Sequence, residues 1–235
     1  MLKTFFTSVY ENANQLNRRN IIELARRART TSGRVVLLDL GCDDGLWTRK
    51  LADAVGADEM HGVEIVDEAA RKAAANGVQV QRLDLSKPMT ELPSAAFDLV
   101  HANQVIEHVP NVDLFVSEVF RLLKPGGYAV ISTENGSSWH NVFAATMGWQ
   151  IFSLTNVSSL KAGLGNPFAI QRGGTPYTGT WTHKTIFNYR GLIEMFQAHG
   201  FRSVEIAGAG YFPLPGILGK IDPRHSAFIT AFAQK

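Results

Sequence analysis

The chain has 235 residues, 45% of them hydrophobic, so it can bury one substantial core, and we expect a single domain spanning residues 1–235. The formal net charge of +2 gives no molecule-wide field that would mark a nucleic-acid binder. The single cysteine, Cys42, excludes an intramolecular disulfide and a thiolate metal cluster. No apolar run resembles a secretory signal or is long enough to span a bilayer, and we predict a cytoplasmic protein.

The N-terminal segment, residues 1–30, has a helical hydrophobic pattern from about Val9 to Ala28. Its apolar stripe consists of Leu16, Ile21, Ile22, Leu24 and Ala25. The remaining surface carries arginines, namely Arg18, Arg19, Arg26, Arg27 and Arg29. We interpret them as the solvated face of a helix that packs on the domain, and contact with nucleic acid or acidic lipid is the alternative.

Short apolar runs then alternate with helical patterns. Strands are expected at residues 34–39, 60–65, 78–83, 97–102 and 128–133, and helices at residues 46–55, 67–76 and 112–123. A Pro-Gly-Gly turn at residues 125–127 precedes the fifth strand. This alternation predicts an α/β fold in which helices cover both faces of a doubly wound, largely parallel sheet.

The alternation stops after the fifth strand, and residues 134–183 form a predicted insertion with a short helix at 142–147. Its aromatic residues are Trp139, Phe143, Trp149, Phe152, Phe168, Tyr177 and Trp181. These rings either wall off an acceptor site or form a small satellite core, and aromatic side chains serve both purposes. A helix at 189–199 and strands at 201–206 and 227–232 complete the predicted fold.

A glycine-containing turn, Gly41-Cys42-Asp43-Asp44-Gly45, follows the first strand and precedes a helix. Such a turn offers backbone amides and a helix N-terminus at the sheet edge where open α/β folds bind ligands. A dinucleotide fingerprint needs G-x-G-x-x-G, but Asp43 and Leu46 occupy its second and third glycine positions. The paired aspartates would also repel a pyrophosphate, whereas a ligand with cationic groups avoids that conflict.

Acidic residues recur at the ends of the first three strands, as Asp39, Glu64 and Asp84. S-adenosylmethionine has an ammonium group for Asp39, ribose hydroxyls for Glu64 and an adenine amino group for Asp84. The pattern therefore predicts S-adenosylmethionine as cofactor and S-adenosylhomocysteine as product. The remaining predicted cofactor contacts are Gly41, Cys42, Asp43, Gly45, Trp47, Ile65, Leu85, Asn103 and Gln104.

Together with residues 97–109 and 122–127, these motifs resemble the class I, Rossmann-like S-adenosylmethionine-dependent methyltransferases, and in particular the methyltransferase type 11 or ubiquinone-biosynthesis-like group. The resemblance implies a seven-stranded sheet in the order 3-2-1-4-5-7-6 with strand 7 antiparallel. It also places Asn103 and Gln104 along the methionyl part of the cofactor. Asp43 departs from the pattern, because many relatives have glycine there and aspartate adopts positive φ less readily.

Methyl transfer requires alignment of nucleophile, methyl group and leaving sulfur, and a base where the nucleophile must lose a proton. Histidine suits that task, and the candidates are His108, His140 and His183. No metal is expected. We predict O-methylation of a small molecule or saccharide, because residues 137–150 and 211–216 are similar to methyltransferases of surface-glycan or lipid-linked saccharide modification. Aromatic rings could equally hold a quinone or phenol.

Three alternatives stay open at this point. The chain could methylate RNA or tRNA through its N-terminal arginines, although it has no recognisable RNA-binding appendage and we rank nucleic acid low as a partner. It could bind S-adenosylmethionine without catalysis, or be an NAD-dependent oxidoreductase of related fold. The sequence predicts no transmembrane segment and leaves the oligomeric state open.

Overall fold

The computed structural model describes residues 2–28, 33–176 and 181–235 of the chain, and the side chains of the first helix from Thr7 onward. Two residues named above, Arg29 and Tyr177, lie outside the described residues. The same holds for residues 29–30, at the end of the N-terminal segment, and for residues 177–180 within the predicted insertion.

Seven strands form one sheet in the order β3-β2-β1-β4-β5-β7-β6. The strands are β1 (Val36–Leu40), β2 (Glu59–Val63), β3 (Gln79–Gln81), β4 (Phe97–Asn103), β5 (Leu123–Glu134), β6 (Ser203–Ala209) and β7 (Phe228–Gln234). Neighbours from β3 to β5 pair in parallel, and β7 pairs antiparallel with both β5 and β6. The predicted fold class and strand order are confirmed.

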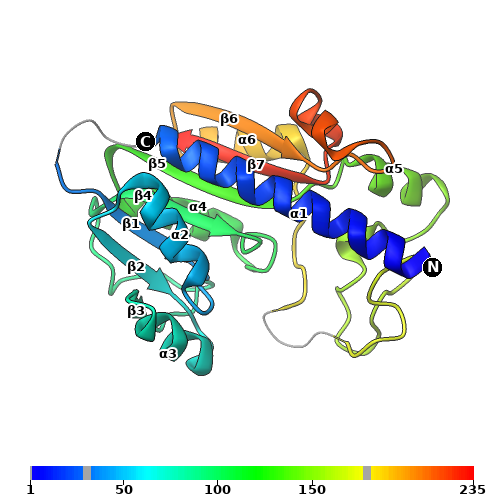
Figure 1. Cartoon of the computed structure of the whole chain (residues 1–235), viewed down its shortest axis with the longest axis horizontal. Coiled ribbons are helices and arrows are strands. Elements are labelled where there is room, and N and C mark those ends of the chain that lie inside the picture. Colours follow the sequence, from blue (N-terminus) through cyan, green and yellow to red (C-terminus); the bar gives the residue numbers. More distant parts are fainter. Residues whose placement is uncertain (1, 29–32, 177–180) are drawn as a thin grey trace.

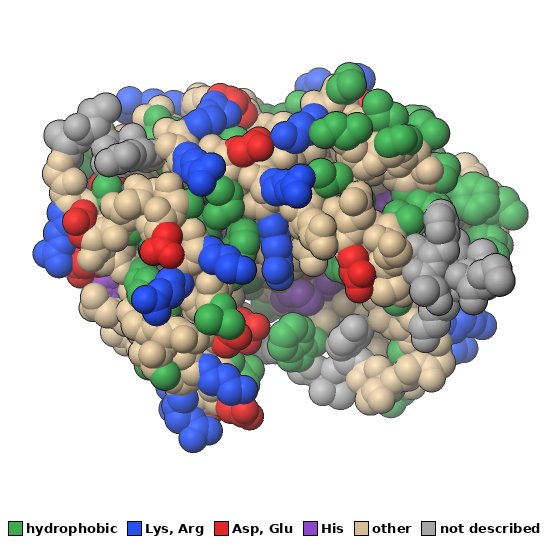
Figure 2. Space-filling view, viewed as in Figure 1, with side chains coloured by type: hydrophobic (Ala, Val, Ile, Leu, Met, Phe, Trp, Pro, Cys, Tyr) green, Lys and Arg blue, Asp and Glu red, His purple; other side chains and the backbone are tan. Residues whose placement is uncertain are grey.

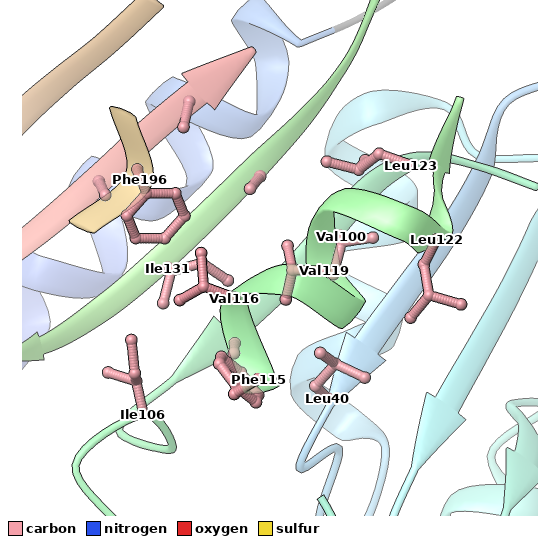
Figure 3. Packing of buried hydrophobic residues seen from close by; sticks show 14 of the residues in the cluster. Leu40, Val100, Ile106, Phe115, Val116, Val119, Leu122, Leu123, Ile131 and Phe196 are labelled. Atoms are coloured by element: carbon pink, nitrogen blue, oxygen red, sulfur yellow. The ribbon is translucent and has the colours of Figure 1, made fainter. Parts of the chain in front are cut away.

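Helices cover both faces of this sheet (Figure 1). They are α1 (Leu2–Arg27), α2 (Leu46–Val55), α3 (Asp67–Ala75), α4 (Val112–Leu122), α5 (Trp139–Thr146) and α6 (Tyr189–Ala198), with 3₁₀ turns η1 (Phe152–Leu154), η3 (Gly216–Lys220) and η4 (Pro223–His225). Strand residues alternate between two cores because successive side chains point to opposite faces. Leu38 and Val100 pack with α4 and α6, whereas Leu37 and Leu99 pack with α1 and α2. Figure 3 shows Phe115, Val116 and Val119 of α4 and Phe196 of α6 in the first of these cores.

Buried amides attach α1 to the sheet. The side chain of Asn17 is fully buried, and it accepts a hydrogen bond from the Thr230 hydroxyl at 2.9 Å and contacts the Ser132 hydroxyl at 2.8 Å. Two of the predicted surface arginines interact with other parts of the chain. The Arg18 guanidinium lies 5.2 Å from the Trp47 ring centroid, and Arg27 forms an ion pair with Glu205 at 2.8 Å. These contacts favour the interpretation of α1 as a packing helix.

Several predicted boundaries differ from the structure. The first helix begins earlier, at Leu2, and β3 is shorter than predicted because it is an edge strand with one neighbour. The predicted Pro-Gly-Gly turn lies within β5, which follows α4 without a loop. Gly126 has a φ of 81° there, and the pairing of β4 with β5 shifts register between Phe97 and Leu99. The turn is therefore an irregularity inside a strand.

Candidate active site

The backbone of the turn after β1 is left-handed at three positions. Gly41, Asp43 and Gly45 have φ values of 78°, 47° and 77°. A Cβ atom on Gly45 would approach the Ala73 Cα to 2.9 Å, and one on Gly41 would approach the Val105 Cγ2 to 2.8 Å. At Gly41 and Gly45, both the lack of room for a Cβ atom and the positive φ value therefore favour glycine. Asp43 adopts the left-handed conformation that short polar side chains tolerate.

Glu64 follows the end of β2 and joins this turn to the next helix. One carboxylate oxygen, Oε2, accepts a hydrogen bond from the Asp43 amide at 3.0 Å, and Oε1 accepts one from the Val66 amide at 2.8 Å. Glu64 is half-buried, and its neighbour Ile65 is 44% exposed. The carboxylate therefore has a defined orientation at the open edge of the sheet, and an apolar side chain lies next to it.

Asp39, in β1, has both carboxylate oxygens engaged by the protein. The Thr48 hydroxyl donates to Oδ2 at 2.6 Å, and His101 Nδ1 lies 2.6 Å from Oδ1. The Trp47 indole donates to His101 Nε2 at 3.5 Å, so Nδ1 carries the ring proton and donates to Asp39. Asp39 and His101 are buried, and Asp39 is therefore fixed by two side chains at the base of the turn.

Cys42 is part of the turn, but its side chain faces the interior. The sulfur occupies the space that a side chain at Gly62 would need, and Cys42 packs with Ala73 and Val78. Burial, followed by the nearby carboxylates of Asp39 and Glu64, raises the pKa of the Cys42 thiol to about 12. A protonated thiol is no nucleophile, so only the backbone of Cys42 is available at the site.

The other predicted cofactor residues lie at the ends of β3 and β4. The Asp84 carboxylate accepts hydrogen bonds from the Ser86 amide at 3.0 Å and hydroxyl at 2.6 Å, which lower its pKa. Leu85 packs against the core, and Asn103 Oδ1 accepts from Asn17 Nδ2 at 3.2 Å. Gln104 has a φ of 57° and a buried Nε2 without a hydrogen-bond partner.

A pocket of about 510 Å³ opens at the carboxyl end of β5, where β6 and β7 also meet. Its lining aromatic rings come from α1, the insertion, the loop after β6 and the first residue of β7, as Tyr10, Phe152, Phe168, Tyr211, Phe212 and Phe228. Its polar lining residues include Asn12, Glu134, His140 and Gln171. The carboxyl ends of parallel strands share one edge, so the pocket lies on the same edge as the glycine turn.

The aromatic residues of the insertion belong to two groups in the structure. Phe143 and Trp149 have ring centroids 5.9 Å apart, and Trp149 and Phe168 are 5.4 Å apart. These rings form a small cluster of their own. Phe168 belongs both to this cluster and, with Phe152, to the pocket wall. The helix within the insertion, α5, begins at Trp139, three residues before the predicted start.

His140 lines the pocket. Its Nε2 lies 3.2 Å from the Ser138 hydroxyl, and its ring packs edge-on against Phe152 at 5.5 Å. Burial lowers the pKa of His140 to about 4. The imidazole is thus neutral near pH 7, and this is the protonation state that a general base requires.

His108 and His183 lie together, outside the pocket lining, with ring centroids 4.7 Å apart. Burial and the neighbouring His183 lower the pKa of His108 to about 4. The sequence analysis did not assign a role to their neighbour Glu107, which is fully buried and accepts a hydrogen bond from the Thr133 hydroxyl at 3.0 Å. Burial raises the pKa of Glu107 to about 8. Figure 2 shows histidine side chains in the hollow on this face of the molecule.

Acid is expected to destabilise the protein partly through His140. The unfolded chain binds a proton near pH 6.5, but the folded state binds it only near pH 4, so this stability is complete above 6.5 and is lost as the pH falls toward 4. The loss is at most about 3 kcal/mol. Urea unfolding of the wild type and a His140→Leu variant at pH 7.5, 5.5 and 4.5 measures it. Equal losses in both proteins would contradict the assignment.

Comparison with known proteins identifies the family. A family model described as a methyltransferase domain matches residues 10–206. The chain belongs to this family and is a class I, S-adenosylmethionine-dependent methyltransferase, which confirms the predicted enzyme class and cofactor. The interpretations as an NAD-dependent oxidoreductase and as a non-catalytic binding protein are set aside.

The mitochondrial ubiquinone biosynthesis O-methyltransferase of Mus musculus is 27% identical over 187 residues, 77% of this chain and 45% of that protein. The ubiquinone biosynthesis O-methyltransferase of Sinorhizobium fredii is 32% identical over 103 residues, 42% of this chain and 41% of that protein. The matched part of the chain thus covers less than half the length of either relative.

Solved structures share the fold. A methyltransferase of Thermotoga maritima superposes with a TM-score of 0.60 at 18% identity, covering 100% of this chain and 98% of that one. Phosphoethanolamine N-methyltransferase 2 of Haemonchus contortus, in complex with S-adenosylmethionine, gives a TM-score of 0.59 at 15% identity over 92% of this chain and 52% of that one. In the described part of the chain, no helix has the length and apolar character needed to cross a membrane.

Proposed function

We propose that this methyltransferase transfers its methyl group to a hydroxyl oxygen of a small, largely apolar molecule bound in the pocket at the end of β5. The observation that carries the proposal is the lining of that pocket, in which aromatic rings outnumber the polar side chains. Such walls bury an aromatic or prenyl-like acceptor, and a few polar groups orient its hydroxyl. The names of the relatives, which are O-methyltransferases of ubiquinone biosynthesis, agree with transfer to an oxygen atom.

Apolar side chains extend from the pocket to the surface. Phe143, Leu214 and Ile217 are 54%, 55% and 54% exposed, and Figure 2 shows hydrophobic side chains gathered at the end of the molecule where α5 lies. Exposed apolar groups around a pocket favour an apolar ligand over a strongly hydrated one. This feature favours a phenol-like acceptor over the saccharide that the sequence also suggested.

His140 is the proposed base. Among the three candidate histidines, His140 is the one that lines the pocket in which the acceptor would bind. It would take the hydroxyl proton as the oxygen attacks the methyl carbon and the sulfur leaves with its electron pair. Glu64 is the proposed ribose acceptor and Asp39 a positioning residue for the methionyl end. The remaining turn residues would contact the cofactor through their backbone.

A panel of acceptors incubated with methyl-labelled S-adenosylmethionine tests the proposal. Expected substrates are catechols and prenylated phenols, with label recovered as a methyl ether by mass spectrometry. The comparison arms are reducing sugars, a lipid-linked saccharide and tRNA. Transfer to a saccharide or tRNA without transfer to any phenol would contradict the proposal, and tRNA transfer would restore the role of the α1 arginines.

A further inference from the structure

Two histidines and a buried glutamate converge beyond the carboxyl end of β4. One ligand atom each from Glu107, His108 and His183 lies within 4.8 Å of the other two. Glu107 and His108 follow β4, and His183 comes from the far end of the insertion. We propose that these three residues bind a divalent transition-metal ion of the Zn²⁺ or Mn²⁺ type.

The hydrogen bonds of both imidazoles leave the same ring nitrogen free. His183 Nδ1 lies 2.6 Å from the Ser153 carbonyl oxygen, and His108 Nδ1 lies 3.3 Å from the Thr182 carbonyl oxygen. A carbonyl oxygen only accepts, so each Nδ1 donates a proton and each Nε2 retains its lone pair. Metal-binding histidines are oriented by this type of contact, in which the other ring N–H donates to a backbone carbonyl.

Glu107 supplies an independent observation. Its side chain is fully buried, and although Oε2 accepts from the Thr133 hydroxyl, Oε1 has no hydrogen-bond partner. Burial of a polar oxygen without a partner costs free energy, and the partner that the surroundings suggest is a cation bound also by two neutral imidazoles. Two neighbouring charges have opposite effects on a cation at this place. The Glu134 carboxylate adds negative charge near Glu107 and would attract the cation. Lys184, which donates a hydrogen bond to the Thr182 hydroxyl, adds positive charge near His108 and would repel it.

The ligand set fits a transition-metal ion. Two imidazoles and one carboxylate form a known set for catalytic zinc, which leaves a further position for water or substrate. Metal–ligand bonds of about 2.0–2.2 Å place ligand atoms roughly 3.5 Å apart in a tetrahedral site. The present spacing within 4.8 Å therefore closes by small side-chain rotations.

The place of the cluster suggests what the ion would do. Along the shared edge, β4 lies between β1, which carries the glycine turn, and β5, whose last residue lines the pocket. The cluster lies outside the pocket lining but close to Glu134, which lines the pocket. An ion there would bind an acceptor hydroxyl that projects from the pocket toward β4, lower its pKa and so allow a weak base such as His140 to take its proton. This role rests on the proposed function, whereas metal binding does not. The proposal departs from the metal-free reaction expected from the sequence.

Metal binding is measured on the whole chain after chelator treatment, without acceptor. Co²⁺ titration followed by visible absorption and Zn²⁺ calorimetry are expected to give one site per chain. His183→Ala and Glu107→Gln are expected to weaken Zn²⁺ binding at least about 10-fold, since each removes a ligand. Glutamine keeps the shape of the side chain and an acceptor for Thr133, and thermal melts verify that it folds. His140→Ala, outside the cluster, is the control with unchanged binding.

Two results would overturn the proposal: no Co²⁺ absorption or Zn²⁺ heat in the wild type, or equally tight binding by folded His183→Ala protein. Failure of the proposed function is distinguishable from these results. An enzyme that binds the ion and methylates no phenol contradicts the acceptor and leaves the metal site intact. An enzyme that methylates phenols and binds no ion contradicts only the metal site.

Discussion

A His140→Ala variant is expected to lose about 10²–10⁴-fold in kcat while its affinity for S-adenosylmethionine stays unchanged. The residue lines the proposed acceptor pocket and is neutral near pH 7, because burial lowers its pKa to about 4. Removal of a positioned base slows proton transfer, but the glycine turn after β1, where the cofactor is proposed to bind, is not disturbed.

Single-turnover rates and cofactor titration measure the two quantities separately. His199→Ala is the matched control, because His199 lies at the end of α6 and bonds the Met195 carbonyl oxygen of its own helix. His140→Gln is a second variant that keeps polarity without basicity, and it is expected to be as slow as alanine. Undiminished turnover in His140→Ala would remove the assignment and return the role of base to His108 or His183.

The strand segments and the glycine turn were predictable because both are encoded locally, whereas the strand order was implied by the resemblance to class I methyltransferases. Alternating apolar runs define the strands, and the turn residues follow β1 without interruption. Asp43 was recognised as a departure, and the structure accommodates it with a φ of 47°. The limits of the strands were less predictable, since pairing with neighbours decides where β3 ends and where β5 begins.

The contacts of Asp39 could not be predicted in the same way. Asp39 and His101 are 62 residues apart, and they meet because β1 and β4 pair in one particular register. The sequence analysis assigned His101 no role. An explicit alignment of the two predicted strands is the signal that could have suggested this pair.

The pocket and the cluster beside it depend on tertiary structure still more strongly. The pocket wall combines residues of α1, the insertion and the loop before η3. Glu107 adjoins His108 in the sequence, but its burial and the approach of His183 follow only from the path of the insertion. Local patterns therefore predicted an ordered set of residues for the cofactor side of the site, and they gave for the acceptor side only a list of histidines and aromatic residues.

A Glu64→Ala variant is expected to bind S-adenosylmethionine and S-adenosylhomocysteine about 10- to 100-fold more weakly. The substitution removes the acceptor of the Asp43 and Val66 amides, so the left-handed turn loses a charged hydrogen-bond partner in addition to the proposed ribose contact. Calorimetry with both ligands measures the loss. Because the two ligands share the ribose and differ in the methylsulfonium, a contact with the ribose predicts equal losses for both.

Glu59→Ala is the matched control for this experiment, since Glu59 lies at the opposite end of β2 and pairs with Arg34 at 2.9 Å. Its cofactor affinity is expected to stay within about twofold of the wild type, because Glu59 pairs with the start of β1 and not with the glycine turn that follows its end. A loss confined to S-adenosylmethionine in Glu64→Ala would indicate that the carboxylate acts on the sulfonium charge. Unchanged affinity for both ligands would contradict a contact between Glu64 and the cofactor, and the glutamate would then serve only to hold the turn against the end of β2.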